Sequence, residues 1–209
     1  MNKEYIFNQI KNLRRITSKC DFNQSLELQI ILSGFDPKKD KIIIGKQVLL
    51  NPVKAVKIIC VMSDLKHKQE TIEKGYPFID CKGVRELDDV KKKKKFIKRY
   101  DGFVASEAII QQITKIIGKD LIKYGKFPII VKNDDDLDDK ITEVKNSVKW
   151  MFKKKHYCYN AIGHEGLKDE ELVENIISSI DYIRSLLASK QKIEKAVIKF
   201  TMGPPKIII

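Results

Sequence analysis

Residues 55–62 read AVKIICVM, and every position except Lys57 is apolar. A strand of this composition is expected where helices cover both faces of a sheet, as in parallel α/β sheets. Helices and strands alternate after this run, which predicts an open α/β sheet with crossover connections. The expected helices cover residues 64–75, 83–90 and 107–117, and the expected strands cover residues 77–79, 101–105 and 127–131.

The two ends of the chain have a different pattern. Residues 25–30, SLELQI, alternate strictly, so Leu26, Leu28 and Ile30 are expected to face a core while Ser25, Glu27 and Gln29 face outward. Such alternation is typical of a strand with one covered face. The remaining elements expected in these end segments are helices at 4–17, 137–148 and 169–187 and strands at 41–50, 156–162 and 195–200.

The charge changes at the same boundaries. Residues 1–54 carry ten basic and five acidic side chains, residues 55–133 carry 18 and ten, and residues 134–209 carry 13 of each. We therefore expect an α/β protein of two domains, with 55–133 inserted into a base built from 1–54 plus 134–209. The net charge of +13 favours a polyanionic partner, either nucleic acid or an acidic membrane surface. The alternative is a soluble protein that is simply rich in lysine.

Cysteine and histidine show no ligand spacing. The four cysteines lie at 20, 60, 81 and 158, without a C-x-x-C pair, and the three histidines are equally dispersed, so neither a metal nor another cofactor is expected. Cys60, inside an apolar run, is interpreted as a buried thiol. No apolar run approaches the ~20 residues of a membrane span, and the first 15 residues lack a secretory pattern. We expect a soluble intracellular protein with reduced cysteines and no membrane partner.

Enzymatic motifs are missing where an α/β enzyme would carry them. A nucleotide site needs a glycine-rich turn after the first strand, whereas residues 63–67, SDLKH, contain no glycine. Ser106 follows a strand but lacks the small neighbours of a nucleophile elbow, so it is interpreted as a helix N-cap. His164, in a loop, is assigned either a structural role or an RNA contact. No catalytic residue is predicted.

The lysine run 91–95 has two interpretations that do not exclude each other. It is an electrostatic footprint for RNA phosphates, or it is the solvated end of a helix. Neither interpretation gives sequence specificity, because lysine contacts phosphate as a point charge.

Several motifs, taken in order along the chain, resemble the L-one family of ribosomal proteins, called L-ten-a in eukaryotes. Residues 22–29, FNQSLELQ, and residues 201–204, TMGP, resemble the family's signatures near its two ends. Between them, residues 35–41 (FDPKKDK), 100–107 (YDGFVASE), 125–128 (GKFP) and 162–164 (IGH) stand in the family's order. The resemblance covers nearly the whole chain, but Phe200 stands where the family usually has a serine before Thr-Met-Gly.

The resemblance implies an α/β RNA-binding base domain and an inserted Rossmann-like α/β domain. It implies a structural, non-enzymatic constituent of the large ribosomal subunit in the cytoplasm, assembled in the nucleus or nucleolus if the cell is eukaryotic. The expected partners are stalk-junction rRNA, deacylated tRNA leaving the exit site and other ribosomal components, with messenger RNA left open. A nucleolar assembly factor of the same fold and a nucleotide-binding enzyme remain the alternatives. The expected RNA-binding residues are Phe22, Ser25, Glu27, Gln29, Lys38, Lys39, Lys41, Lys46, Lys154, Thr201, Met202, Gly203 and Pro204.

Overall fold

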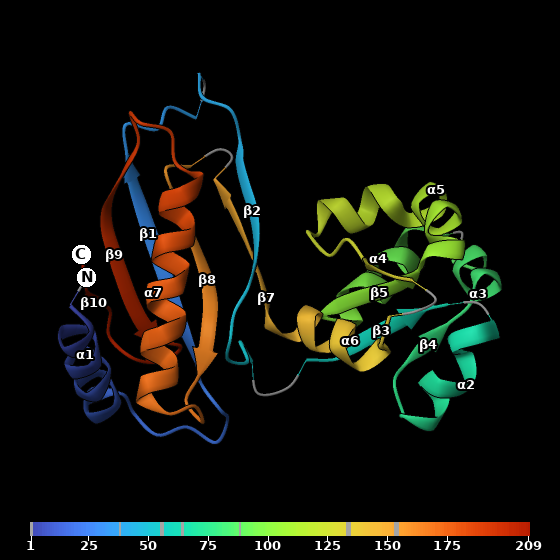
Figure 1. Ribbon diagram of the computed structural model, residues 1–209, viewed down its shortest axis with the longest axis horizontal. Helices are drawn as coiled ribbons and strands as arrows, with labels where there is room; N and C mark the ends of the chain where they lie inside the picture. Colours follow the sequence, from blue (N-terminus) through green and yellow to red (C-terminus); the bar gives the residue numbers. More distant parts are fainter. Residues whose placement is uncertain are drawn as a thin grey trace. The chain divides into compact units, whose positions relative to one another are not determined.

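A computed structural model describes residues 2–37, 39–54, 57–63, 65–87, 89–132, 135–152 and 155–209, without the side chains of 65–67. The chain forms two compact units. Unit 1 comprises Met1–Ala55 and Asn146–Ile209, and unit 2 comprises Val56–Lys145. The protein is therefore of the mixed α/β class, with both chain ends in one unit and a continuous insertion in the other (Figure 1).

Unit 1 is built on a four-stranded antiparallel sheet in the order β10-β9-β1-β8, next to a two-stranded sheet of β2 and β7. Helices α1 and α7 pack on one face of the large sheet, where Leu26, Leu28 and Ile30 meet Trp150 and Phe152 in the core. The elements are α1 (Lys3–Ile16), β1 (Ser25–Ser33), β2 (Ile43–Val48), β7 (Ser147–Phe152), β8 (Tyr157–His164), α7 (Asp169–Leu186), β9 (Lys192–Phe200) and β10 (Lys206–Ile207).

The predicted alternation of β1 is confirmed. Its residues alternate between half-buried and buried along the whole strand, with Ser25, Glu27 and Gln29 on the half-buried side. Among the described residues of unit 1, no helix covers this side, so the sheet of unit 1 has an open face. The face continues onto β2 and β7, whose outward residues include Lys46 and Lys149, partners in the strand register.

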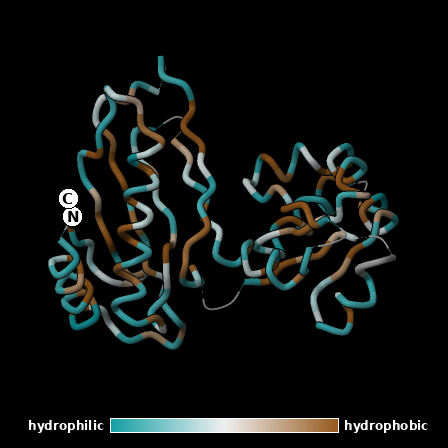
Figure 2. Tube along the Cα trace, viewed as in Figure 1, coloured by the Kyte–Doolittle hydropathy of each residue, from teal (hydrophilic) through white to brown (hydrophobic). Residues whose placement is uncertain are grey.

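Unit 2 has a parallel sheet in the order β4-β3-β5-β6. Alternate residues of β3 enter two different cores: Cys60 and Met62 join one, and Ile59 and Val61 join the other. Its strands are mostly hydrophobic in Figure 2, as the apolar run predicts. The elements are β3 (Ile59–Met62), α2 (Leu65–Glu73), β4 (Phe78–Ile79), α3 (Cys81–Arg85), α4 (Val90–Arg99), β5 (Gly102–Ser106), α5 (Glu107–Lys123), β6 (Ile129–Val131) and α6 (Leu137–Asn146).

The second domain boundary differs from the expected one at residue 134. Helix α6 places Leu137, Ile141 and Val144 in a core with Val61 and Val104, so it packs within unit 2. The expected helix to residue 148 therefore ends at Asn146, and an unexpected strand, β7, follows it. Its residue Val148 lies in the core of unit 1. Helical spacing runs smoothly from α6 into this strand, which hides the boundary in the sequence.

Two further expectations need correction. The single helix expected at 83–90 is a short α3 followed by α4, which contains the whole lysine run. Ser106 occupies the N-cap position of α5, but its side chain makes no capping hydrogen bond.

Cys60 is 1% exposed, as expected for a buried thiol, and burial raises its pKa to about 12. No helix among the described residues is long and apolar enough to cross a membrane.

Candidate nucleic-acid interface

The two segments with family-like motifs meet where β1 begins and β9 ends. The antiparallel register pairs Leu26 with Phe200. Just beyond this pair, the backbone N–H of Thr201 donates to the Ser25 carbonyl at 3.1 Å, and the Ser25 N–H donates to Thr201 Oγ1 at 3.2 Å. We call this region the β1–β9 site: it comprises Phe22, Ser25, Glu27, Thr201, Met202, Gly203 and Pro204.

Gln24 organises this site from the interior, and sequence analysis missed it. The side chain is fully buried. Its Nε2 donates to the Ser18 carbonyl at 2.9 Å, and its Oε1 accepts from the Met202 N–H at 3.1 Å. Its backbone carbonyl accepts from the Glu165 N–H at 2.8 Å. One buried residue thus joins the loop after α1, the turn after β9 and the loop after β8.

Gly203 has a structural reason to be glycine. A Cβ at this position would lie 2.4 Å from Thr17 Oγ1, so a larger residue would collide with the end of α1. The Gly203 N–H also closes the turn by donating to the Phe200 carbonyl at 2.9 Å. Gly203 is among the residues expected to bind RNA, whereas the close approach seen here is to the protein's own helix end.

The side chains exposed at the β1–β9 site are suited to contact RNA bases and sugars. Phe22 is 51% exposed and Met202 is 64% exposed, although both are large and apolar. Glu27 is half-buried on the open sheet face, and its carboxylate has no hydrogen-bond or ion-pair partner among the described residues. An aromatic ring offers a stacking surface to an unpaired base, and a free carboxylate accepts hydrogen bonds from ribose hydroxyls or base amines.

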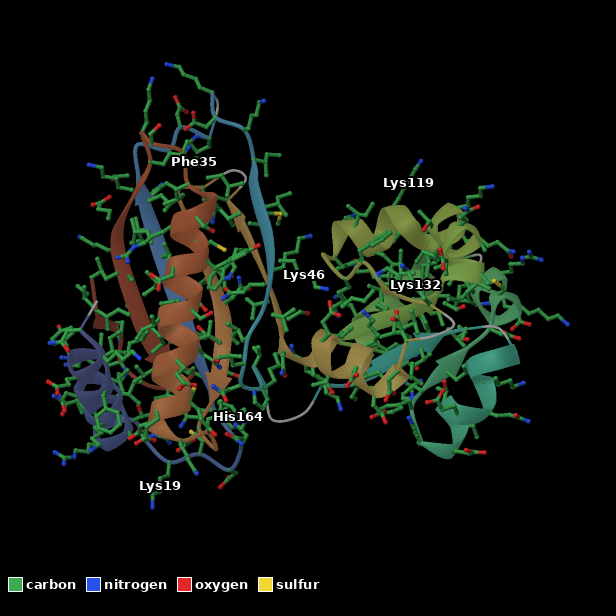
Figure 3. The ribbon with its side chains drawn as sticks, viewed as in Figure 1. Lys19, Phe35, Lys46, Lys119, Lys132 and His164 are labelled. Carbon is green, nitrogen blue, oxygen red and sulfur yellow. The ribbon has the colours of Figure 1, made fainter. Side chains whose placement is uncertain are left out.

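The other expected RNA-binding residues are spread over unit 1. Gln29 lies further along the open face of β1, and Lys46 is exposed on β2. Lys39 and Lys41 are exposed in the loop after β1, at the opposite end of that strand from Ser25. Figure 3 shows the separation, with Phe35 labelled at the loop end and His164 at the end where β1 begins. The expected set is therefore not one cluster. Lys38 and Lys154 lie outside the described residues.

His164 and Arg14 brace the site rather than extend it. His164 Nδ1 accepts from the Gly166 N–H at 3.2 Å, and partial burial lowers the pKa of the ring, which favours its neutral form. Arg14 reaches from α1 to the same loop: its Nη1 and Nη2 donate to the carbonyls of Glu165 and Leu167 at 2.7 and 2.6 Å. Both residues fix the loop that Gln24 also holds.

Phe200, the departure from the family motif, points into the protein. It is 1% exposed and lies in the core of unit 1, with the Arg14 guanidinium 5.7 Å from its ring centroid. The alternation of β9 places this position on the covered face. Phe200 is thus placed to stabilise the β1–β9 site through its packing in the core of unit 1.

In unit 2, helix α4 carries a dense set of cations. Lys91, Lys92, Lys94 and Lys95 are exposed, and no described acidic side chain forms an ion pair with them. Lys93 is half-buried, with its Nζ 3.3 Å from the Ile116 carbonyl of α5. The run is therefore helical and solvent-facing over most of its length. Among the described residues, no three His, Cys, Asp or Glu side chains gather as a metal site would require.

Known proteins resemble this chain over most of its length. The model of the ribosomal protein L1p/L10e family matches residues 13–204. The large ribosomal subunit protein uL1 of Dictyostelium discoideum is 39% identical over 90% of this chain and 88% of its own length. The uL1 proteins of Neurospora crassa and Drosophila melanogaster are 40% and 36% identical, over 91% and 90% of this chain and 88% of each relative. The chain therefore belongs to the ribosomal protein L1p/L10e family.

Proposed function

We propose that this protein is a structural constituent of the large ribosomal subunit, in which unit 1 binds ribosomal RNA through the β1–β9 site. The relatives' names, large ribosomal subunit protein uL1, support the assignment to that subunit. The observation that carries RNA binding is the exposure of Phe22, before β1, and Met202, after β9, at a site held by buried hydrogen bonds, together with a free Glu27 carboxylate on the open face of β1.

The RNA expected at this site is the folded junction of the subunit's mobile stalk. A rigid protein surface suits a folded RNA, because shape and 2′-hydroxyl groups distinguish such a target better than a base sequence does. Gln24, Arg14 and the Thr201–Ser25 hydrogen bonds give the β1–β9 site that rigidity. Transient contact with deacylated tRNA at the exit site, and with messenger RNA, belongs to the same proposal.

Unit 2 has a secondary role in this proposal. The exposed lysines of α4 attract phosphates over distances of about 10 Å at moderate salt, which suits transient contact with RNA more than a fixed grip. Cations of this kind raise affinity for RNA in general and do not select a sequence.

Co-sedimentation tests the proposed function. A tagged copy of the protein would be expressed in the organism from which it comes. Its position in a sucrose gradient would be compared with that of large-subunit RNA. We expect it to sediment with free large subunits and with whole ribosomes, and to remain there at a salt concentration that strips loosely bound basic proteins. Recovery only at the top of the gradient would contradict the proposal. Recovery only with nuclear precursor particles would favour an assembly factor instead.

A further inference from the structure

A second candidate site lies between strands β7 and β8, away from the β1–β9 site. Strand β7 is hydrogen-bonded to β2 and strand β8 to β1, so the two strands diverge into separate sheets (Figure 1). A groove of about 410 Å³ lies against them. We call it the β7–β8 groove, and the residues that line it are Lys149, Met151, Lys155, Tyr157, Cys158, Tyr159 and Asn160.

The groove presents an aromatic ring with nothing stacked on it. Tyr159 is 64% exposed, and no described residue makes a ring contact or hydrogen bond with its side chain. Tyr157 is fixed by contrast: Lys155 Nζ donates to its hydroxyl at 2.6 Å and lies 4.9 Å from its ring centroid. Met151, 43% exposed, adds a polarisable apolar surface. A planar, unstacked ligand would bury Tyr159 and Met151 together.

Asn160 also lines the groove, and its side chain has a fixed orientation. Its Nδ2 donates to the Lys149 carbonyl at 2.8 Å, which sets which end of the amide is nitrogen. Its Oδ1 receives no hydrogen bond from the described residues. Its side-chain amide is therefore held against β7 at the edge of the groove, where it can report on a ligand that enters.

The positive charge of the groove favours planar ligands that also carry a negative charge. Among the described residues, its lining contains two lysines and no acidic side chain. Lys46, on β2, lies beside Lys149 in the strand register and extends the cationic surface. On the other side, Tyr159 is the register partner of Gln29, so the groove is continuous with the open face of β1. A ligand with a planar base and a phosphate fits this combination of aromatic and cationic groups.

We infer that the β7–β8 groove binds one unpaired nucleotide of RNA. Its base stacks on Tyr159, and its phosphates lie against Lys149 and Lys155. The inference rests on the proposed function only in taking RNA as the ligand. It adds a separate contact that requires a single-stranded residue, whereas the β1–β9 site meets a folded junction.

A titration with simple RNA probes tests the groove. Isotope-labelled full-length protein would be titrated with hexaadenylate and with a short RNA duplex, and followed by NMR and by fluorescence anisotropy. We expect hexaadenylate to shift the Asn160 side-chain amide and the backbone signals of Tyr159, and the duplex to leave the Asn160 signal in place. Tyr159→Ala should weaken hexaadenylate binding about fivefold or more, since stacking on an aromatic ring is lost. Tyr159→Phe should retain binding.

Tyr5→Ala is the matched control, because Tyr5 is also exposed, at 46%, but lies on α1. It should leave hexaadenylate affinity unchanged. Equal affinities for wild-type protein and Tyr159→Ala, or the same groove shifts with the duplex, would overturn the inference and leave only non-specific attraction to lysines. A different result would contradict the proposed function, namely that wild-type protein does not sediment with large subunits. Tyr159→Ala protein should still sediment with them, because the β1–β9 site is intact.

Discussion

The sheets of the two units differ in how they are covered, and the difference separates binding surface from scaffold. In unit 2 both faces of the parallel sheet are packed, so its polar groups reach solvent from helices such as α4. In unit 1 the sheet has one open face, where side chains from β1 have positions fixed by the strands. Side chains on a rigid sheet keep fixed relative positions, so they can match the shape of a folded RNA. The long lysine side chains on a helix supply positive charge that is free to move. We therefore expect specificity from unit 1 and salt-dependent attraction from unit 2.

The largest effect is expected for Met202→Asp. A carboxylate at this exposed position would face RNA phosphates, and we expect a loss of about 2–4 kcal/mol in affinity for a stalk-junction RNA fragment. The measurement is a filter-binding assay. Ile122→Asp is the control, since Ile122 is 61% exposed on α5 of unit 2. Similar losses for both variants would mean that the added charge acts on RNA from a distance, and that the comparison between the units fails.

Gly203→Ala should damage the turn itself. The new Cβ would lie 2.4 Å from Thr17 Oγ1, and overpacking of this kind costs about 1–3 kcal/mol of folding free energy. Urea unfolding would measure the loss. The double variant Thr17→Ala with Gly203→Ala removes the colliding oxygen and should recover part of the stability. Absence of recovery would show that the glycine is needed for some other reason.

Two buried glutamines make a matched pair for testing how the site is held. Gln24 joins three loops at the β1–β9 site, whereas Gln47 accepts from Trp150 Nε1 at 3.2 Å and donates to Ser178 Oγ at 2.8 Å, on the covered face of β2. Replacement of either residue by Met leaves buried partners unsatisfied, at a cost of about 1–3 kcal/mol in stability.

Only Gln24→Met should also weaken RNA binding, because the turn that carries Met202 would shift. We expect the affinity to fall roughly tenfold, which corresponds to about 1.4 kcal/mol of binding free energy. Binding would be measured at a temperature where both variants are folded. Gln24→Glu keeps an acceptor for the Met202 N–H but places a carboxylate oxygen against the Ser18 carbonyl at a fully buried position, so a loss at least as large as for Gln24→Met is expected. An equal loss for Gln47→Met would assign the effect to stability alone.

The smallest effect is expected at α4. Replacement of Lys91, Lys92, Lys94 and Lys95 by Gln should flatten the dependence of RNA association on salt, with the slope falling by about 0.9 for each duplex phosphate that a lysine no longer neutralises. Lys93 stays in place, because it contacts α5. The same four positions changed to Arg should keep the slope. A changed preference between RNA sequences, with the slope intact, would contradict a purely electrostatic role.

Most of the fold follows from hydrophobic patterning. The continuous apolar run at β3 correctly predicted a sheet covered on both faces, and the alternation at β1 correctly predicted its open face. The boundary at α6 could not be predicted, because its apolar residues continue at helical spacing to Val148, which belongs to β7. Which core receives an apolar residue depends on packing between distant segments, and local spacing does not contain that information.

The candidate site could be predicted only where side chains face outward. Phe22 and Met202 belong to motifs, and the structure places both as exposed residues in the segments where β1 begins and β9 ends. The role of Gln24 could not be predicted, because a glutamine before a strand is ordinarily a surface residue. Its burial depends on three loops that meet only in the folded chain. The lysines were grouped by charge alone, and charge does not determine which end of a strand they occupy.

Photocrosslinking from the β1–β9 site tests the central claim most directly. Benzoylphenylalanine would replace Phe22 in protein assembled into large subunits, and Ile72, 58% exposed on α2, would carry the same group as the control. We predict a crosslink to ribosomal RNA from position 22, mapped to the stalk junction by primer extension, and at most a weak one from position 72. A crosslink from position 22 only to protein, with RNA captured from position 72, would contradict RNA binding by the open face of unit 1.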